Sequence, residues 1–274
     1  QKIIFLLFIF LMNFSCSKDE EIKVTAAPQE KAYEVYKEAI ELIEKINYFF
    51  AEKKFSEAEK ILPEQEHSAK AALMTSYCYY AINFYDEASK SLERFLRIYP
   101  ANENVPYANY LMALVSYEQI LDEKKDIVPL LESKKKIQKF IKKFPDSEYT
   151  LDLKYKLDLI NNQLAAKEMY VSKYYIKTQK WIPAINRLKI IVEDYNETVF
   201  IEEALHRLVE VYYKIGLENE AKSAAILLGY NYYYHPTFYN YKETTLFTRL
   251  KINTGSWFNE YDSSKRRLQL AITY

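Results

Sequence analysis

Three stretches of the chain share one spacing of small and apolar residues, and this repetition constrains the fold more than any other feature. The stretches are FYDEASKSLERFLRIYP (84–100), LESKKKIQKFIKKFP (131–145) and KWIPAINRLKIIVEDYN (180–196). Each has a small residue, an apolar residue four positions later and another three beyond: Ala88, Leu92 and Phe95; Ser133, Ile137 and Phe140; Ala184, Leu188 and Ile191. Spacings of four and three place such side chains on one face of a helix. The repetition therefore predicts an array of similar helices.

These segments predict the second helix of a repeated helix pair. In the first two, a proline stands twelve positions after the small residue, at Pro100 and Pro145, and would end the helix. The pattern resembles the second helix of a tetratricopeptide repeat, whose unit is about 34 residues long. We expect five units, over 32–65, 69–100, 104–145, 149–197 and 199–233. The predicted fold is all-α: a superhelical solenoid of about five tetratricopeptide-like helix pairs over 30–236, with a concave binding face.

Two local features predict where helices begin and end. Residues 147–179 contain neither proline nor glycine, which favours one long helix or two nearly collinear ones. Ser56 is followed by Glu59, the spacing of a capping box, ahead of apolar Ile61 and Leu62. This spacing predicts that a helix begins near Ser56.

The N-terminal residues have the pattern of a secretory signal. Lys2 precedes ten apolar residues (3–12), which is too short for a bilayer span of about 20 residues but suits a signal-peptide core. Ser15 and Cys16 follow at the expected cleavage position. A cysteine there is typical of bacterial lipoproteins, in which the thiol is acylated and becomes the first mature residue, although Asn13 stands where leucine is usual. The alternative is an ordinary secretory signal with an incidental cysteine.

The signal divides the chain and gives its location. We expect residues 1–15 to be a lipoprotein signal peptide, 16–29 a flexible tether, and 237–274 a C-terminal extension that is part helical. Ser17, rather than aspartate, follows the cysteine, which favours the periplasmic face of the outer membrane over retention at the inner one. Cys78 then has no partner for a disulfide in the mature chain, and we expect it to be a small buried group.

Composition and motifs argue against catalysis. Only three glycines are present, which disfavours phosphate-binding loops and hairpin-rich β folds. Basic and acidic residues balance at 38 each, which disfavours nucleic acid as the main partner. The three histidines, His67, His206 and His235, are far apart and match no metal-ligand spacing. We expect no enzymatic activity, no cofactor and no metal site.

Lysines are concentrated in one segment, with eight between Lys124 and Lys143. A solvated helix face is the simpler interpretation. The alternative is contact with anionic lipid headgroups or with an acidic surface of a partner.

Three long segments resemble one known family in order and spacing. They are NVPYANYLMALVSYEQI (104–120), FPDSEYTLDLKYKLDLINNQLAAKEMYVSKYYIKTQKWIPAINR (144–187) and EEALHRLVEVYYKIGLENEAKSAAILLGYNY (202–232). With the lipoprotein signal, they resemble the BamD family of the outer-membrane β-barrel assembly machinery. The resemblance implies a lipid-anchored scaffold that binds a BamA-type barrel subunit, other assembly lipoproteins and unfolded outer-membrane proteins, and promotes their folding and insertion.

The resemblance also assigns roles to individual residues. Cys16 matches the acylated cysteine, and Arg187 matches the arginine that contacts the periplasmic POTRA domain of the barrel subunit. In the family, the concave face of the first two repeats is proposed to receive targeting signals of unfolded clients. By repeat geometry, the residues of the second unit that would line this groove are Lys70, Leu73, Tyr77 and Tyr80. The alternative function is that of another periplasmic tetratricopeptide-repeat lipoprotein, one that scaffolds cell-wall or envelope enzymes.

Overall fold

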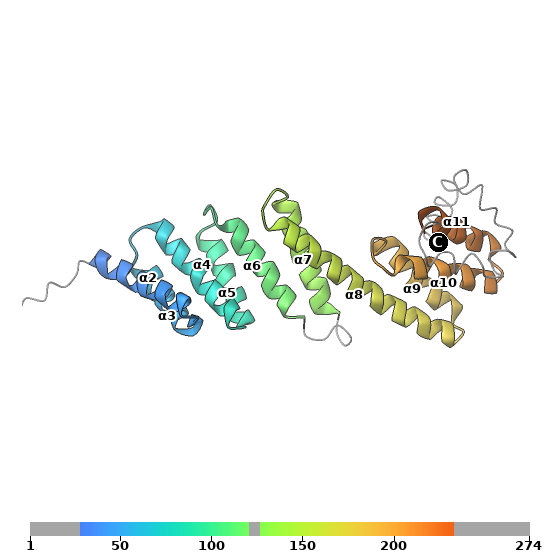
Figure 1. Ribbon diagram of the computed structural model, residues 1–274, viewed down its shortest axis with the longest axis horizontal. Helices are drawn as coiled ribbons and strands as arrows, with labels where there is room; N and C mark the ends of the chain where they lie inside the picture. Colours follow the sequence, from blue (N-terminus) through green and yellow to red (C-terminus); the bar gives the residue numbers. More distant parts are fainter. Residues whose placement is uncertain (1–27, 121–126, 233–274) are drawn as a thin grey trace, which may run out of the picture.

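A computed structural model describes residues 28–120 and 127–232, and the regular structure of this part is entirely helical (Figure 1). Its ten helices follow one another in a row. They are α2 (Pro28–Glu44), α3 (Tyr48–Ile61), α4 (Gln65–Ala81), α5 (Tyr85–Ile98), α6 (Val105–Glu118), α7 (Val128–Lys143), α8 (Thr150–Lys177), α9 (Trp181–Asp194), α10 (Ile201–Lys214) and α11 (Glu218–Tyr232). The prediction of an all-α solenoid of five helix pairs is confirmed.

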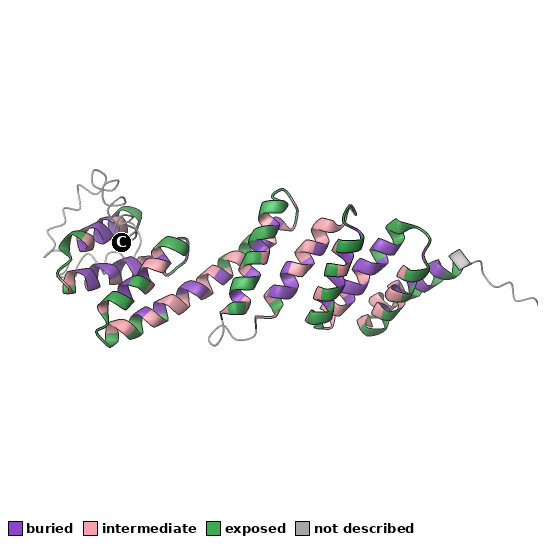
Figure 2. Ribbon diagram, turned by 180° about the vertical axis from the view of Figure 1, so that it is seen from behind, coloured by how far each residue is buried: buried purple, intermediate pink, exposed green. Residues whose placement is uncertain are grey.

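Each helix packs mainly against the next one along the chain. The first helices of neighbouring pairs also meet, because α6 contacts both α4 and α8. Buried residues lie along the faces that helices turn toward their neighbours (Figure 2). They form three apolar clusters: one in α2–α4, one from α4 to the first half of α8, and one from the second half of α8 to α11.

The repeated triad of small and apolar residues forms the centre of the core. All nine predicted triad residues are at most 2% exposed. The same spacing recurs in the second helices of the first and last pairs, as Ala51, Phe55 and Ala58 and as Ala221, Ala225 and Leu228, all fully buried. A small side chain lets two helix backbones approach closely, so that the apolar residues one and two turns later reach the neighbouring helix.

α8 is one continuous helix of 28 residues, about 42 Å long, which confirms one of the two predicted forms. Its first half buries Leu153, Ile160 and Leu164 in the middle cluster, and its second half buries Ala165 and Met169 in the last cluster. At 100° per residue, the two buried faces differ by about 140° around the helix axis. α8 therefore packs against α7 with one face and against α9 with another.

The prediction that a helix begins near Ser56 is wrong, because α3 begins at Tyr48. Ala51 and Phe55 already lie on the buried face, so apolar burial extends the helix by two turns before Ser56. Glu59 instead binds α5: its Oε1 accepts a hydrogen bond from Arg94 Nη1 at 2.7 Å, and its Oε2 pairs with Arg94 Nη2. The carboxylate is only 8% exposed, and this bidentate pair joins the first and second helix pairs.

The turns within four of the pairs share a left-handed residue. Ile46, Asn83, Gln179 and Gly216 have φ between 57° and 83°. In each turn the left-handed residue donates to the carbonyl three residues back, and the next residue donates to the carbonyl five back, as in Ile46 N to Ile43 O (2.8 Å) and Asn47 N to Leu42 O (2.8 Å). This is the Schellman termination, for which glycine is the usual residue. The chain therefore makes three of these four turns without glycine.

Replacing Ile46 by glycine is expected to stabilise the protein. A β-branched residue in this conformation is strained by about 1–2 kcal/mol, and Ile46 is 75% exposed, so little burial is lost. After the entropic cost of glycine, we expect a net gain of about 0.5–1 kcal/mol in the free energy of unfolding. Urea titration followed by circular dichroism would measure it. Asn83→Gly is the control and should give no gain, because asparagine tolerates φ > 0; equal effects would contradict the strain argument.

Candidate partner-binding surfaces

The predicted site residues lie on two separate helices. Arg187 is in the middle of α9, and the four predicted groove residues, Lys70, Leu73, Tyr77 and Tyr80, are on α4. Cys16 lies outside the described residues. Two candidate surfaces can therefore be described: one around Arg187, and one on the side formed by the first helices α4, α6 and α8.

Arg187 is held by a partner on the preceding helix. Its Nη1 donates to both carboxylate oxygens of Glu168 on α8, at 3.1 Å to Oε2 and 3.4 Å to Oε1. The arginine side chain is 41% exposed and the glutamate 18%. Among the described residues, no acceptor contacts Nη2 of Arg187. The ion pair thus fixes the guanidinium in place while leaving part of its fork of donors open.

The α4 surface differs in one residue from the predicted groove. Lys70 is exposed, and Tyr77 and Tyr80 are half-buried with their rings near Tyr48 and Tyr85 (centroids 6.1 and 6.2 Å apart). Leu73 is only 5% exposed and packs in the middle apolar cluster. The leucine therefore supports the surface from beneath, and the groups that can meet a ligand are the lysine and the two tyrosines.

Tyrosines continue this surface across α6 to the start of α8. Tyr110 stacks on Tyr149 with ring centroids 4.6 Å apart, and Tyr107 lies 5.6 Å from Tyr149. Burial, followed by the neighbouring phenols of Tyr77, Tyr149 and Tyr80, raises the pKa of Tyr107 to about 12. We call Tyr77, Tyr80, Tyr107, Tyr110 and Tyr149 the tyrosine band. At neutral pH its phenols are protonated, so they offer aromatic faces and hydroxyl groups rather than charge.

One carboxylate orders the far end of the tyrosine band. The hydroxyl of Tyr110 donates to Asp152 Oδ2 at 3.0 Å, and Lys156 Nζ donates to Oδ1 at 2.9 Å. Burial and this hydrogen bond raise the pKa of Tyr110. Sequence reasoning missed Tyr107, Tyr110 and Tyr149; the signal that could have found them is the recurrence of tyrosine in successive first helices.

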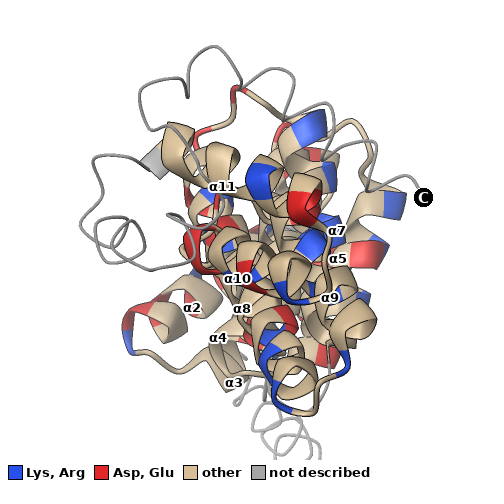
Figure 3. Cartoon of the chain, turned by 90° about the vertical axis from the view of Figure 1, so that its right-hand side faces the viewer, with Lys and Arg blue, Asp and Glu red and all other residues tan. Residues whose placement is uncertain are grey.

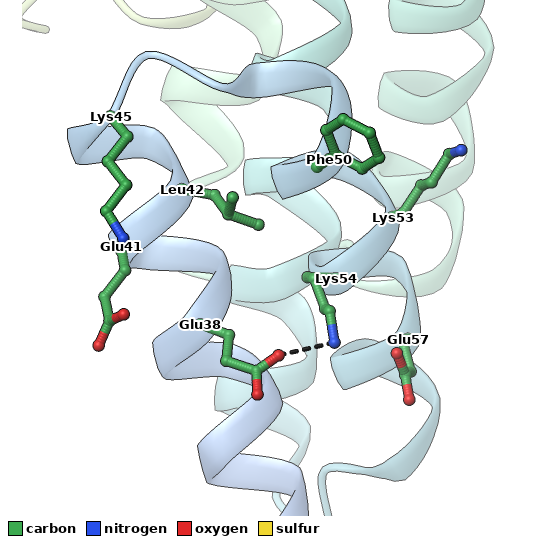
Figure 4. A pocket seen from close by; sticks show the side chains of 8 residues that line it. All are labelled: Glu38, Glu41, Leu42, Lys45, Phe50, Lys53, Lys54 and Glu57. Carbon is green, nitrogen blue, oxygen red and sulfur yellow. Dashed lines mark ion pairs between the residues drawn. The ribbon is translucent and has the colours of Figure 1, made fainter.

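Two open pockets lie on the described part of the chain, and only the second borders a candidate surface. One, of about 440 Å³ between α2 and α3, exposes Leu42 and Phe50, and Lys54 Nζ pairs with Glu38 Oε2 at 2.6 Å on its wall (Figure 4). Its three lysines and three glutamates cancel in charge, so it does not select for a charged ligand. The other, of about 540 Å³, adjoins the tyrosine band between Asn104 and Tyr149.

Within residues 28–120 and 127–232, no group of three or more His, Cys, Asp or Glu side chains could hold a metal ion. His67 is exposed and pairs with Glu64, whereas His206 is buried in α10, where burial lowers its pKa. Cys78 is buried, as predicted, and burial raises the pKa of its thiol to about 12. None of the described helices is both long and apolar enough to cross a membrane.

The chain is similar to known proteins over most of its length. The family model YfiO, described as "Outer membrane lipoprotein", matches residues 28–227. A protein of Caulobacter vibrioides named outer membrane protein assembly factor BamD is 36% identical over 211 residues, 77% of this chain and 69% of the relative. A protein of the same name from Rickettsia prowazekii is 36% identical over 227 residues, 83% of this chain and 89% of the relative. One from Neisseria meningitidis is 29% identical over 208 residues, 72% and 78% of the two chains.

Proposed function

The chain belongs to the YfiO outer membrane lipoprotein family and is a non-enzymatic factor of outer-membrane protein assembly, and from this premise we propose that it is a lipid-anchored scaffold. It binds a BamA-type barrel subunit, other assembly lipoproteins and the targeting signals of unfolded outer-membrane proteins. The single observation that carries this proposal is the family match over 28–227, which spans nearly the whole row of helix pairs. The alternative of a scaffold for cell-wall enzymes has no comparable support.

The contact with the barrel subunit is assigned to Arg187. Its guanidinium is preorganised by Glu168 and keeps exposed donors, so a carboxylate on the partner's POTRA domain can bind without an entropic cost for ordering the arginine. The mechanism is one of positioning: the rigid α8–α9 pair presents a fixed cation to the barrel subunit.

Arg187→Glu is expected to weaken binding of the barrel subunit's POTRA domain by at least about tenfold, because like charges then meet across the interface. The purified full-length chains would be compared by titration with that domain, and by co-purification from detergent-solubilised envelopes. The substitution also breaks the ion pair with Glu168, which is worth about 0.2–1 kcal/mol of stability at this exposure.

The double variant Arg187→Glu, Glu168→Arg separates the two effects. It restores an internal ion pair but leaves a carboxylate at position 187. We expect it to recover stability and not binding. If binding also returned, Arg187 would act only by holding α9 against α8, and the assignment of a direct contact would fail.

The client signal is assigned to the surface around Lys70 and the tyrosine band. An extended peptide that ends in an aromatic residue matches it chemically: the ring would pack on Tyr77 and Tyr80, and the terminal carboxylate would pair with Lys70. The protonated phenols of Tyr107 and Tyr110 would donate to or accept from the peptide backbone.

A peptide with a free terminal carboxylate is expected to bind more tightly than the same peptide with a terminal amide, by about three- to tenfold. Lys70→Glu should abolish this preference, whereas Lys37→Glu, at an exposed lysine of α2, should preserve it. Fluorescence anisotropy with a labelled peptide ending in phenylalanine would measure both. A preference that survives Lys70→Glu would place the carboxylate elsewhere.

The anchor is assigned to Cys16. Two or more acyl chains on this cysteine would hold the protein at the outer membrane, because each buried methylene contributes about 0.8 kcal/mol and one chain alone binds only reversibly. We therefore expect Cys16→Ser to release the protein into the soluble periplasmic fraction, as measured by membrane flotation. Cys78→Ser is the control and should stay with the membrane. Retention of Cys16→Ser at the membrane would mean that the cysteine is incidental.

A further inference from the structure

α7 has a large excess of positive over negative charge. Its 16 residues hold six lysines and one glutamate, a net charge of +5, in a chain whose total charge is zero. Figure 3 shows basic and acidic segments interspersed along the row of helices. The rest of the chain therefore has a net charge of −5, so the positive charge of α7 is a local feature that the overall composition does not explain.

Three of the six lysines have contacts inside the protein. Lys143 Nζ lies 4.9 Å from the centre of the Phe144 ring. Lys134 is half-buried, with Nζ 4.7 Å from the centre of the Tyr195 ring, and Lys136 Nζ donates to Ser116 Oγ at 2.6 Å. These two side chains flank the buried face of α7, which is formed by Leu130, Ser133, Ile137 and Phe140. The fold itself therefore accounts for them.

Three others form an exposed row. Lys135, Lys139 and Lys142 are spaced four and three apart, so they lie on one face of the helix, and we call them the lysine stripe. Among the described residues, none of the three has an ion-pair partner, and Glu132 pairs with none of them. Other exposed lysines do form ion pairs, as with Lys173 and Glu203 at 2.9 Å. The stripe is therefore a row of three exposed cations on one helix face with no acidic partner among the described residues.

Folding does not explain the stripe. Like charges at this spacing destabilise a helix by a few tenths of a kcal/mol per pair. Attraction to the helix dipole favours Lys142 and Lys143 in the last turn, but it does not extend back to Lys135 and Lys139. Two apolar residues, Val128 and Leu131, stand 53% and 44% exposed at the other end of the same face. The face thus combines unpaired cations with a short apolar end.

The charge pattern of the neighbouring second helices limits the width of the surface. On α5 the exposed charges are of both signs: Asp86, Glu87, Lys90, Glu93 and Arg97. On α9 the last turn is acidic, with Glu193 and Asp194. A bilayer would meet several helices at once, whereas this positive surface is only one helix wide. The pattern therefore fits a narrow, elongated acidic partner better than a plane.

We propose that the exposed face of α7 binds an acidic polypeptide segment of another protein. Carboxylates of the segment lie along Lys135, Lys139 and Lys142, and an apolar residue packs on Val128 and Leu131. The chemistry sets the direction of binding, with the apolar end of the segment toward the start of α7. This surface is separate from Arg187 and from the tyrosine band.

The test uses the full chain and a fluorescein-labelled peptide with two leucines followed by six glutamates. Binding would be measured by anisotropy at about 50 and about 200 mM NaCl. The triple variant Lys135→Glu, Lys139→Glu, Lys142→Glu is compared with Lys37→Glu, Lys60→Glu, Lys90→Glu. Both change the net charge equally, use exposed lysines, and include one lysine in the last turn of a helix.

We expect the stripe variant to lose at least about tenfold in affinity and the control variant less than about twofold, with equal helicity by circular dichroism. Equal losses, or no binding by the unaltered protein, would overturn the proposal. Vesicles of phosphatidylglycerol and phosphatidylcholine are the second probe. If they bound through the stripe while the peptide did not, the surface would be a membrane contact and the assignment of a polypeptide partner would be wrong.

Discussion

The close approach of two helices at a small residue is the interaction on which the rest of the structure depends. In all five second helices this residue is alanine or serine with no exposed surface, and apolar side chains follow one and two turns later. Because each pair in such an array contacts only its neighbours, every close approach is needed to continue the row. The triad occupies the buried face of each second helix. The opposite, outward face of that helix is not needed for this packing. On the other side of the row, the first helices are free to carry recognition.

α8 links the two candidate surfaces into one rigid unit. Asp152, which orders the tyrosine band through Tyr110, lies near its start, and Glu168, which holds Arg187, lies sixteen residues later. At 1.5 Å per residue, these two carboxylates are about 24 Å apart along one helix. Its buried face turns by about 140° between its two halves, which therefore pack into different clusters without a break in the helix. A client on the tyrosine band and a partner at Arg187 would therefore be held at a fixed separation.

The sequence predicted the parts of the fold that follow from local spacing, and missed those set by contacts between distant residues. The triads of the second, third and fourth pairs were predictable because a large apolar residue stands at each apolar position. Those of the first and last pairs were not, because Ala58 and Ala225 replace it. The apparent capping box at Ser56 failed because the true partner of Glu59 is Arg94, 35 residues away. Leu73 shares a helical face with Lys70 and Tyr77, but contacts from the next helices cover it, which periodicity alone does not reveal.

The degree to which each cation is engaged inside the protein separates structural from functional charge. Arg94 donates from both terminal nitrogens to a carboxylate that is only 8% exposed, and the hydroxyl of Tyr99 reaches the same group, so this arginine has an internal role. Arg187 donates from Nη1 to Glu168 and keeps its other guanidinium donors accessible. The lysine stripe has no described acidic partner at all. The cations that we propose for binding are those with the fewest internal partners, and a total charge of zero does not reveal how they are distributed.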